Sequence, residues 1–328
     1  MKKVMMIIFL AMMVFLAGCE NSVSKEKDDT QINAQQSNNK GSNQNEETDK
    51  QLVATAKNEN GQTFHVISAY KLVDQYVRKI EDSSSESQRY ELWQDIVVDQ
   101  IQDRCFSGVY SHLVSDYAFS LPQDLGRIKS NNSVLKASNI EKYIMEALKT
   151  SAKKFPGPDT TVCLLPQDKG HFAGINVGKG KISVFYSSSF SETSVKSTVA
   201  HEYHHSTWTA KFGEDYKWDL LGSILFEGKA EYFASLVYGQ TSTALYNYMS
   251  TEEEKKLWNT IKNPLHITDQ EKIHNILYGG GKGFPTNFGY VAGYHIAREY
   301  AESHPNATIK EWSKLPPEEL YKKSGYGD

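Results

Sequence analysis

The chain has 328 residues, of which 39% are hydrophobic and 23% are charged, and its formal net charge is −4 at pH 7. This composition supplies enough apolar residues for a sizeable core, and it lacks the positive excess that is typical of nucleic-acid binding. We therefore expect no nucleic-acid partner. The only cysteines are Cys19, Cys105 and Cys163, too few for a disulfide framework; Cys105 and Cys163 could either pair or remain separate buried thiols.

Residues 1–18 have the pattern of a secretory signal. Two lysines precede a short apolar stretch that is too short to span a membrane comfortably. The sequence Leu16-Ala17-Gly18-Cys19 resembles a bacterial lipobox, so Cys19 would become the lipid-bearing N-terminus of the mature protein. We expect a lipoprotein on the extracytoplasmic face of a bacterial cell membrane, and an uncleaved anchor would leave the protein on the same face.

A polar segment follows at residues 19–61. It consists mainly of Asn, Gln, Ser, Lys, Glu and Asp, with few large apolar side chains. Such a segment cannot bury enough surface to offset its conformational entropy, so we predict a disordered tether. The tether would hold the folded part away from the membrane.

The folded part divides into a helical lobe at 62–155 and a second lobe at 156–328. Hydrophobic periodicity predicts helices at 66–81, 87–118 (one long or two shorter) and 139–155, a strand at 160–165, hairpin arms at 172–177 and 181–186, and further helices at 194–212, 218–238, 252–262 and 288–302. The fold class expected from this pattern is α+β and mostly helical, with a small β-sheet directly before the helix at 194–212.

That helix contains His201-Glu202-Tyr203-His204-His205, which matches the H-E-x-x-H pattern of zinc enzymes. Residues four apart lie on one face of a helix, so His201 and His205 can direct both imidazoles toward one Zn²⁺ ion. Glu202 lies about 100° around the helix, where it can act as general base on a zinc-bound water instead of binding the metal. His204 points away from this face, and we expect it to be structural.

A third ligand is needed, because a catalytic zinc ion typically has three protein ligands and one water. In the predicted helix 218–238, Glu227 and Glu231 continue the apolar positions Leu220 and Ile224 at helical spacing. Ionised carboxylates on such a face are costly unless they are paired or bind a cation. We therefore expect them near the metal; the alternative is that they form a salt bridge at the helix edge or face solvent.

These residues resemble the gluzincin metallopeptidases, in which the glutamate of an E-G-x-A segment is the third zinc ligand. The matching segment here is Glu227-Gly228-Lys229-Ala230-Glu231. The chain resembles more closely a bacterial family of unknown function typified by YjaZ, whose members are described as predicted Zn-dependent proteases. This similarity runs from about Tyr90 to Tyr326 and implies a gluzincin-like fold, with residues 156–328 as the zinc-binding catalytic lobe.

The resemblance implies roles for individual residues. His201, His205 and Glu227 would bind the zinc ion, and Glu202 would be the base. Glu231 matches the position of an acidic residue that orients a ligand histidine in gluzincins. Such enzymes bind the substrate backbone on an edge strand beside the active helix, so the hairpin at 172–186 is the candidate for this role.

The similarity also includes Gly289-Tyr290 and Gly293-Tyr294 in the predicted helix 288–302. Peptide hydrolysis places negative charge on the carbonyl oxygen, and one positioned donor is worth roughly 3 to 4 kcal/mol at comparable sites. We predict that Tyr290 is this donor, with Tyr294 as the second candidate and His295 as the third. The alternative is that these side chains only pack or face solvent. His266 and His274 are expected at the surface rather than on the metal.

Together these features predict a lipid-anchored, extracytoplasmic zinc metallopeptidase that hydrolyses peptide bonds of a peptide or protein substrate through water activated by Glu202. Two alternatives remain: a non-catalytic zinc-binding lipoprotein, which would not need Glu202, and a zinc hydrolase that acts on a non-peptide envelope amide. The sequence does not indicate the oligomeric state.

Overall fold

A mixed β-sheet lies at the centre of the computed structural model, which describes residues 52–82, 85–168, 173–213, 216–239, 249–281 and 283–327. The predicted signal sequence, Cys19 and most of the predicted tether lie outside these residues. Among the described residues, the sheet has five strands in the order β1-β2-β3-β5-β4. Strands β2, β3 and β5 are parallel, and the edge strands β1 and β4 are antiparallel to their neighbours. The strands are β1 (Val53–Lys57), β2 (Thr63–Ile67), β3 (Thr160–Pro166), β4 (Gly174–Gly178) and β5 (Lys181–Tyr186).

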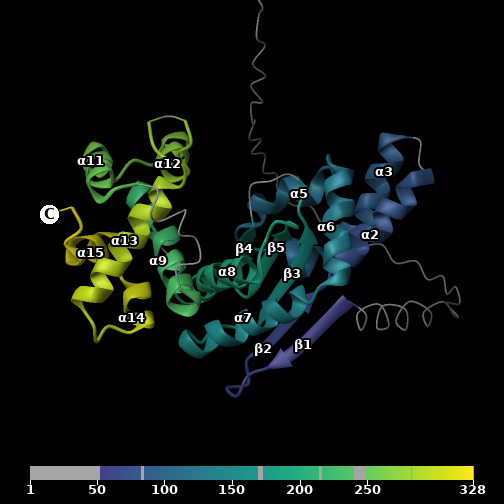
Figure 1. Ribbon diagram of the computed structural model, residues 1–328, viewed down its shortest axis with the longest axis horizontal. Coiled ribbons are helices and arrows are strands. Elements are labelled where there is room, and N and C mark those ends of the chain that lie inside the picture. The colour runs from purple at the N-terminus through teal and green to yellow at the C-terminus, as the bar shows by residue number, and fades with distance from the viewer. Residues whose placement is uncertain are drawn as a thin grey trace, which may run out of the picture. The chain divides into compact units, whose positions relative to one another are not determined.

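Helices make up most of the remaining described chain, which confirms an α+β fold that is mostly helical. The helices are α2 (Tyr70–Lys79), α3 (Glu86–Trp93), α4 (Asp99–Ile101), α5 (Ser115–Phe119), α6 (Leu125–Ala137), α7 (Ile140–Lys154), α8 (Glu192–Phe212), α9 (Leu220–Tyr238), α11 (Thr251–Ile261), α12 (Gln270–Leu277), α13 (Phe288–Ser303), α14 (Ile309–Lys314) and α15 (Pro317–Ser324). In Figure 1, α11 to α15 gather at the left and α2, α3 and α6 at the right. None of the described helices is long and apolar enough to cross a lipid bilayer.

Two sequence predictions are wrong in the N-terminal part. Strand β1 falls inside the segment predicted as a tether, and β2 occupies the start of the helix predicted at 66–81, which begins only at Tyr70. Phe64, Val66 and Ile67 are completely buried, because β2 is covered on both sheet faces. The region 87–118, predicted as one long or two shorter helices, forms two helical stretches, at 86–106 and 111–119.

The sheet separates two hydrophobic cores. Phe64, Val162 and Val184 face the core that packs α7, α8 and the C-terminal helices. Cys163 and Phe185 face the other way, into a core built with the helices between β2 and α6. Because β2 from the predicted N-terminal lobe pairs with β3 from the predicted catalytic lobe, both lobes share one sheet.

Cys105 and Cys163 form a disulfide bond across 58 residues of sequence, and Cys163 lies on β3. Closing a loop of this length is worth about 4 kcal/mol in the chain-entropy model. We expect the double variant Cys105→Ala/Cys163→Ala to have a free energy of unfolding lower by about that amount, measured by urea denaturation. A reductant should destabilise the wild-type protein and leave the double variant unchanged. Equal urea midpoints for the two proteins would contradict the expectation.

Candidate metal centre

Helix α8 carries both motif histidines on one face. Its N-cap is Ser191, whose hydroxyl accepts a hydrogen bond from the Ser194 N–H. The middle of the helix is buried almost all round, and His201 and His205 are only 9% and 3% exposed. Their Nε2 atoms lie 2.9 Å apart, so the four-residue spacing brings the two rings to one point as predicted.

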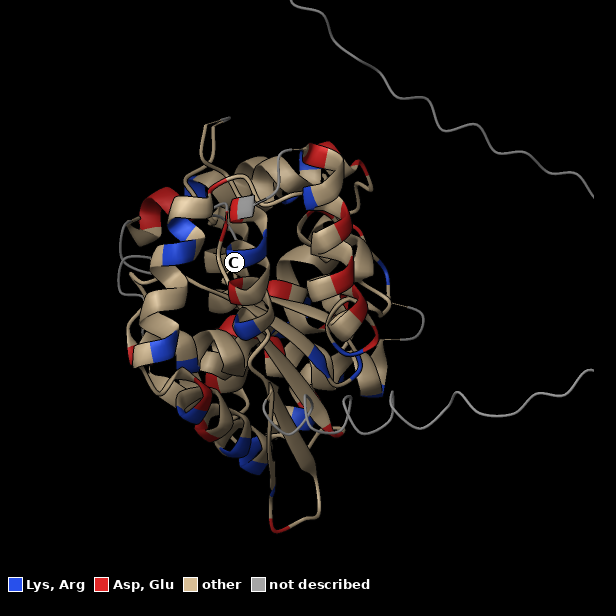
Figure 2. Cartoon of the chain, turned by 90° about the vertical axis from the view of Figure 1, so that its right-hand side faces the viewer, with Lys and Arg blue, Asp and Glu red and all other residues tan. Residues whose placement is uncertain are grey.

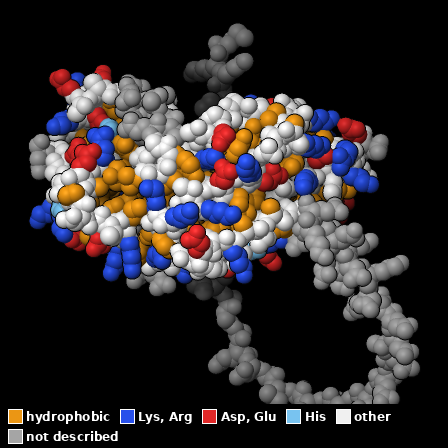
Figure 3. All heavy atoms as spheres, turned by 60° about the horizontal axis from the view of Figure 1, so that its bottom comes forward, with side chains coloured by type: hydrophobic (Ala, Val, Ile, Leu, Met, Phe, Trp, Pro, Cys, Tyr) orange, Lys and Arg blue, Asp and Glu red, His pale blue; other side chains and the backbone are white. Residues whose placement is uncertain are grey.

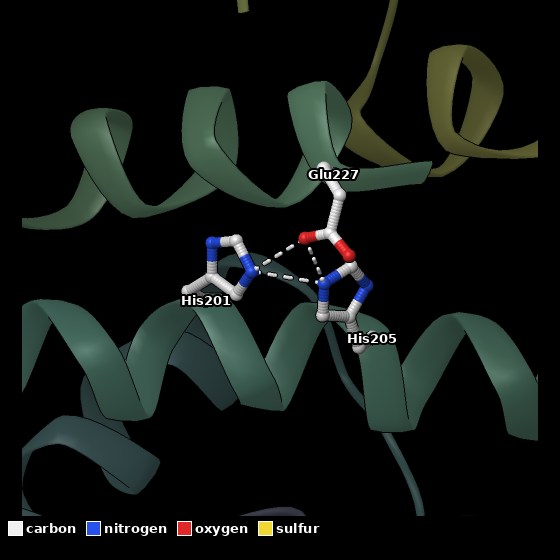
Figure 4. Close-up of side chains that lie close together, drawn as sticks. All are labelled: His201, His205 and Glu227. Carbon is white, nitrogen blue, oxygen red and sulfur yellow. Dashed lines mark hydrogen bonds and ion pairs between the residues drawn. The ribbon is translucent and has the colours of Figure 1, made fainter. Parts of the chain in front are cut away.

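Glu227 reaches the same point from α9, which runs alongside α8 in the view of Figure 4. Its Oε2 atom lies 3.2 Å from Nε2 of His201 and 3.1 Å from Nε2 of His205. Donors that share a tetrahedral zinc ion at ordinary bond lengths lie about 3.3 Å apart. Two imidazole nitrogens and one carboxylate oxygen with this mutual spacing fit a zinc ion, with room in the ligand set for a fourth, non-protein ligand.

Glu231 lies one helical turn after Glu227 and contacts the other side of His201. Its Oε1 atom is 3.1 Å from Nδ1 of that ring. A carboxylate at Nδ1 holds the proton there, which leaves Nε2 free to bind a metal and raises its basicity. This contact places Glu231 where the orienting role implied by the resemblance requires it, and the role itself stays a prediction.

The charges around this point favour a cation. Burial alone would raise the pKa of Glu227, but His205 and His201 outweigh burial and hold this pKa well below its usual range. Burial alone would lower the pKa of His201, but Glu231 and Glu227 outweigh it and raise this pKa well above its usual range. The centre is thus rich in carboxylates that require a compensating positive charge, and a divalent metal ion supplies it.

Glu202 lies beside the ligand set without joining it. Its side chain is buried, and burial raises the pKa of its carboxyl group. The backbone N–H of Asn176 on β4 donates a hydrogen bond to it. The backbone of Gly174 on the same strand also lies close to Glu202, because a Cβ atom at Gly174 would be 2.8 Å from Cγ of Glu202. Edge strand β4 therefore runs directly past the predicted base.

Tyr290 on α13 lies against the metal face of α8. Its ring stacks on His201 with the centroids 6.3 Å apart. It also forms a hydrogen bond with Tyr278, and both tyrosines line the cleft in front of the centre. Burial raises the pKa of Tyr290 well above its usual range, so its phenol remains a neutral donor.

A close crossing of α9 and α13 brings Tyr290 to this position. A Cβ atom at Gly228 would lie 2.0 Å from the carbonyl carbon of Gly293, and a Cβ atom at Gly293 would lie 2.2 Å from the carbonyl oxygen of Ile224. Only glycine at both positions permits this approach. The two glycines belong to the segments that carried the sequence resemblance, and the crossing gives them a physical role.

The other two candidates for the carbonyl donor lie elsewhere. Tyr294 packs against Tyr232, and Nδ1 of His295 is 2.8 Å from the buried carboxylate of Glu254. Tyr326 donates a hydrogen bond to that same carboxylate. The structure therefore gives His295 a role in attaching the C-terminus to α11 and α13.

Other residues support the centre, and the sequence analysis named only His204 among them. Phe226 stacks on His205 with ring centroids 3.9 Å apart. His204, predicted to be structural, pairs with the Ser313 hydroxyl on α14. The Ser313 carbonyl accepts hydrogen bonds from Trp208 and from Lys229, whose pKa is lowered to about 7 by burial. The sequence carried no signal for these contacts, because a lysine is usually exposed.

A cleft of about 680 Å³ opens in front of the centre. Gly174, Ile175 and Asn176 of β4 line it together with His201, Glu202, His205 and Glu227. His274 also lines it although it is exposed, so its expected surface position is correct but its place beside the cleft was missed. The rim is apolar at Val109, Leu113 and Trp218, which are 65%, 52% and 40% exposed.

A second group with metal-binding side chains combines one buried and two exposed residues. Asp219, His266 and Glu318 bring their ligand atoms together. However, the Lys217 ammonium lies 2.7 Å from Asp219, and the Asp219 carboxylate caps α9 by accepting from the Gly222 N–H. These contacts already satisfy Asp219, so we assign the group to helix capping.

The comparisons with known proteins concern the part of the chain that holds this centre. A family model described as predicted Zn-dependent protease (DUF2268) matches residues 140–322, more than half of the chain. A protein from Bacillus subtilis (strain 168) that bears the name uncharacterized protein YjaZ is 27% identical over 190 residues, which are 54% of this chain and 72% of that protein. The region matched by the family model contains His201, Glu202, His205, Glu227 and Tyr290.

Proposed function

The chain belongs to the family of predicted Zn-dependent proteases (DUF2268), and on this basis we propose that it is a zinc metallopeptidase that hydrolyses peptide bonds in the cleft beside α8. The observation that carries the proposal is the convergence of His201, His205 and Glu227 with a separate buried carboxylate, Glu202, beside them. A protein that only stores zinc needs the three ligands, but it has no use for the fourth group.

His201, His205 and Glu227 would hold the ion. A bound zinc ion supplies a Lewis acid that polarises the scissile carbonyl and lowers the pKa of water. Glu202 accepts a proton from the attacking water on a carboxylate oxygen while the water oxygen bonds to the carbonyl carbon. The same carboxyl group then passes this proton to the amide nitrogen as the carbon–nitrogen bond breaks, so Glu202 ends the reaction in its starting state.

Strand β4 is suited to bind the substrate backbone. It is an edge strand that pairs only with β5 in the described sheet. The Ala173 carbonyl accepts a hydrogen bond from the Phe185 N–H on β5. Because backbone groups alternate in direction along a strand, the N–H and C=O groups of Gly174 and Asn176 point away from β5 and toward the cleft. A peptide added to this edge would run past Glu202, and the Tyr290 hydroxyl would donate to its carbonyl oxygen as negative charge develops.

We propose further that the protein acts outside the cytoplasm, held at the membrane by a lipid on Cys19. The signal pattern at 1–18 supports this location, and the disulfide between Cys105 and Cys163 suits an oxidising compartment. In the view of Figure 2, both acidic and basic residues lie along the helices, and the chain's formal net charge is −4, which fits a peptide substrate better than nucleic acid.

The proposal is tested by zinc analysis and peptide-library cleavage on residues 20–328. We expect one zinc ion per chain, and cleavage that stops with a chelator and returns when zinc is restored. A protein without zinc under these conditions would refute the metal centre. Zinc without cleavage would favour the non-catalytic zinc-binding protein, or a hydrolase of envelope amides, which would then be tried as substrates.

A further inference from the structure

We propose that a second, apolar cavity next to the cleft is the specificity pocket of this site and receives one large apolar side chain of the peptide substrate. This inference rests on the proposed function. The cavity measures about 210 Å³ and adjoins the cleft, because Leu113 and Ile175 line both. A cavity of about 150 Å³ already holds a benzene molecule, so this one accommodates a phenyl ring or a branched aliphatic side chain.

Three packed aromatic residues form part of the pocket wall. Trp93, Tyr117 and Phe185 line it and form a continuous series of ring contacts, with centroids 5.8 Å apart for Trp93 and Tyr117 and 4.7 Å apart for Tyr117 and Phe185. The indole N–H of Trp93 donates to the Ala118 carbonyl, and the Tyr117 hydroxyl donates to the Pro166 carbonyl. With these polar atoms bonded to the backbone, the rings offer apolar surface to a ligand.

The acidic groups in the lining do not make the pocket a cation site. Asp168 is 9% exposed, and its two carboxylate oxygens accept from the backbone N–H groups of Gln123 and Asp124. It therefore fixes the chain before α6. Asp116 is exposed at the surface. Negative charge at these positions disfavours an acidic side chain in the pocket, while the aromatic walls favour an uncharged one.

The direction of β4 explains how a substrate reaches the pocket. Side chains on one strand alternate between the two faces of the sheet. Gly174 and Asn176 face α8, where Asn176 bonds to Thr209. Ile175 between them faces the opposite core and lines the pocket. A peptide added to β4 alternates in the same way, so one residue lies toward the metal face while a neighbouring side chain points to the pocket.

Its hollow shape and packed rings distinguish the pocket from ordinary apolar surface. Figure 3 shows hydrophobic side chains in patches on one face of the molecule, interrupted by charged residues, so exposed apolar surface does not by itself mark a binding site. The pocket is a hollow whose wall includes three packed aromatic rings, and it adjoins the cleft at Leu113 and Ile175. Trp93, Leu113, Tyr117 and Leu121 in its lining lie outside the region matched by the family model.

The test compares peptides that differ at one position, with Phe, Leu, Ala, Asp or Lys there, in zinc-loaded wild type and in Ser120→Trp. Ser120 is exposed at the pocket, so the indole fills the cavity without entering the core. Ser133→Trp is the matched control, because Ser133 is also exposed and lines neither cavity. Thermal unfolding followed by circular dichroism verifies that all three proteins are folded.

We expect wild type and Ser133→Trp to cleave the Phe and Leu peptides with a kcat/KM about 10- to 200-fold above that of the Ala peptide, and Ser120→Trp to lose most of this ratio. A preference for Lys or Asp, or an equal ratio in all three proteins, would overturn the pocket. If wild type cleaves no peptide, the proposed function fails. The pocket is then tested separately by the binding affinities of the labelled peptides, measured by fluorescence anisotropy. The pocket would be supported if wild type bound the Phe peptide more tightly than the others and Ser120→Trp lost this preference. Equal binding of all peptides would overturn the proposed pocket.

Discussion

Replacing Glu202 with glutamine is expected to remove hydrolysis and to leave zinc bound. Glutamine keeps the size of the side chain and can still contact the Asn176 backbone, but its amide cannot accept and return a proton. General acid–base groups contribute about 10²- to 10⁴-fold to the rate, so kcat should fall by at least that range. Steady-state kinetics on a cleaved library peptide, together with zinc analysis of the same protein, measures both effects.

The zinc content of this variant decides between two roles for Glu202. Full zinc occupancy with lost turnover supports a base that lies beside the ion. Loss of zinc would instead make Glu202 a ligand and would contradict the assignment of Glu227 as the third one. Undiminished hydrolysis with zinc present would show that another group accepts the proton.

Replacing Glu227 with alanine is expected to lower the zinc affinity by more than 100-fold, because it removes one of the three converging ligand atoms and leaves His201 and His205 as a two-ligand site. The buried carboxylate that balances the two histidines is lost as well. Isothermal titration with zinc, after removal of metal by a chelator, measures the change.

Glu231→Ala provides the graded control for this experiment. Its carboxylate contacts Nδ1 of His201 and not the metal face, so its loss should weaken zinc binding by about 10- to 100-fold. Equal zinc affinity in the Glu227 variant and wild type would eliminate Glu227 as a ligand. A larger effect for Glu231 than for Glu227 would exchange the roles of the two glutamates.

Local sequence patterns predicted the centre of the molecule well. Four-residue spacing on one helix was sufficient to place His201 and His205 together, and the same periodicity placed Glu227 and Glu231 on one face of the next helix. These relations span one or two helical turns, so they do not depend on contacts with distant parts of the chain. The α+β class and the family resemblance were also confirmed.

Features that depend on contacts distant in sequence were not predictable in this way. Strand β2 pairs with β3 almost a hundred residues later, and its apolar residues read as the start of a helix because both sheet faces are covered. The pairing of Cys105 with Cys163 and the aromatic pocket likewise depend on how the helices between β2 and α6 pack over the sheet. The position of Tyr290 follows from two glycines that only the crossing of α9 and α13 brings together.

The sheet between the two cores also has a consequence for internal motion. Strands β3 and β5 are paired on both edges and covered on both faces, so their amide protons exchange with deuterium only through the largest openings of the structure. Among the described strands, β4 pairs with β5 alone, and smaller fluctuations release it. The strand that offers its edge to a peptide is therefore free to adjust its backbone, while the neighbouring strand keeps a fixed frame beneath the reacting groups.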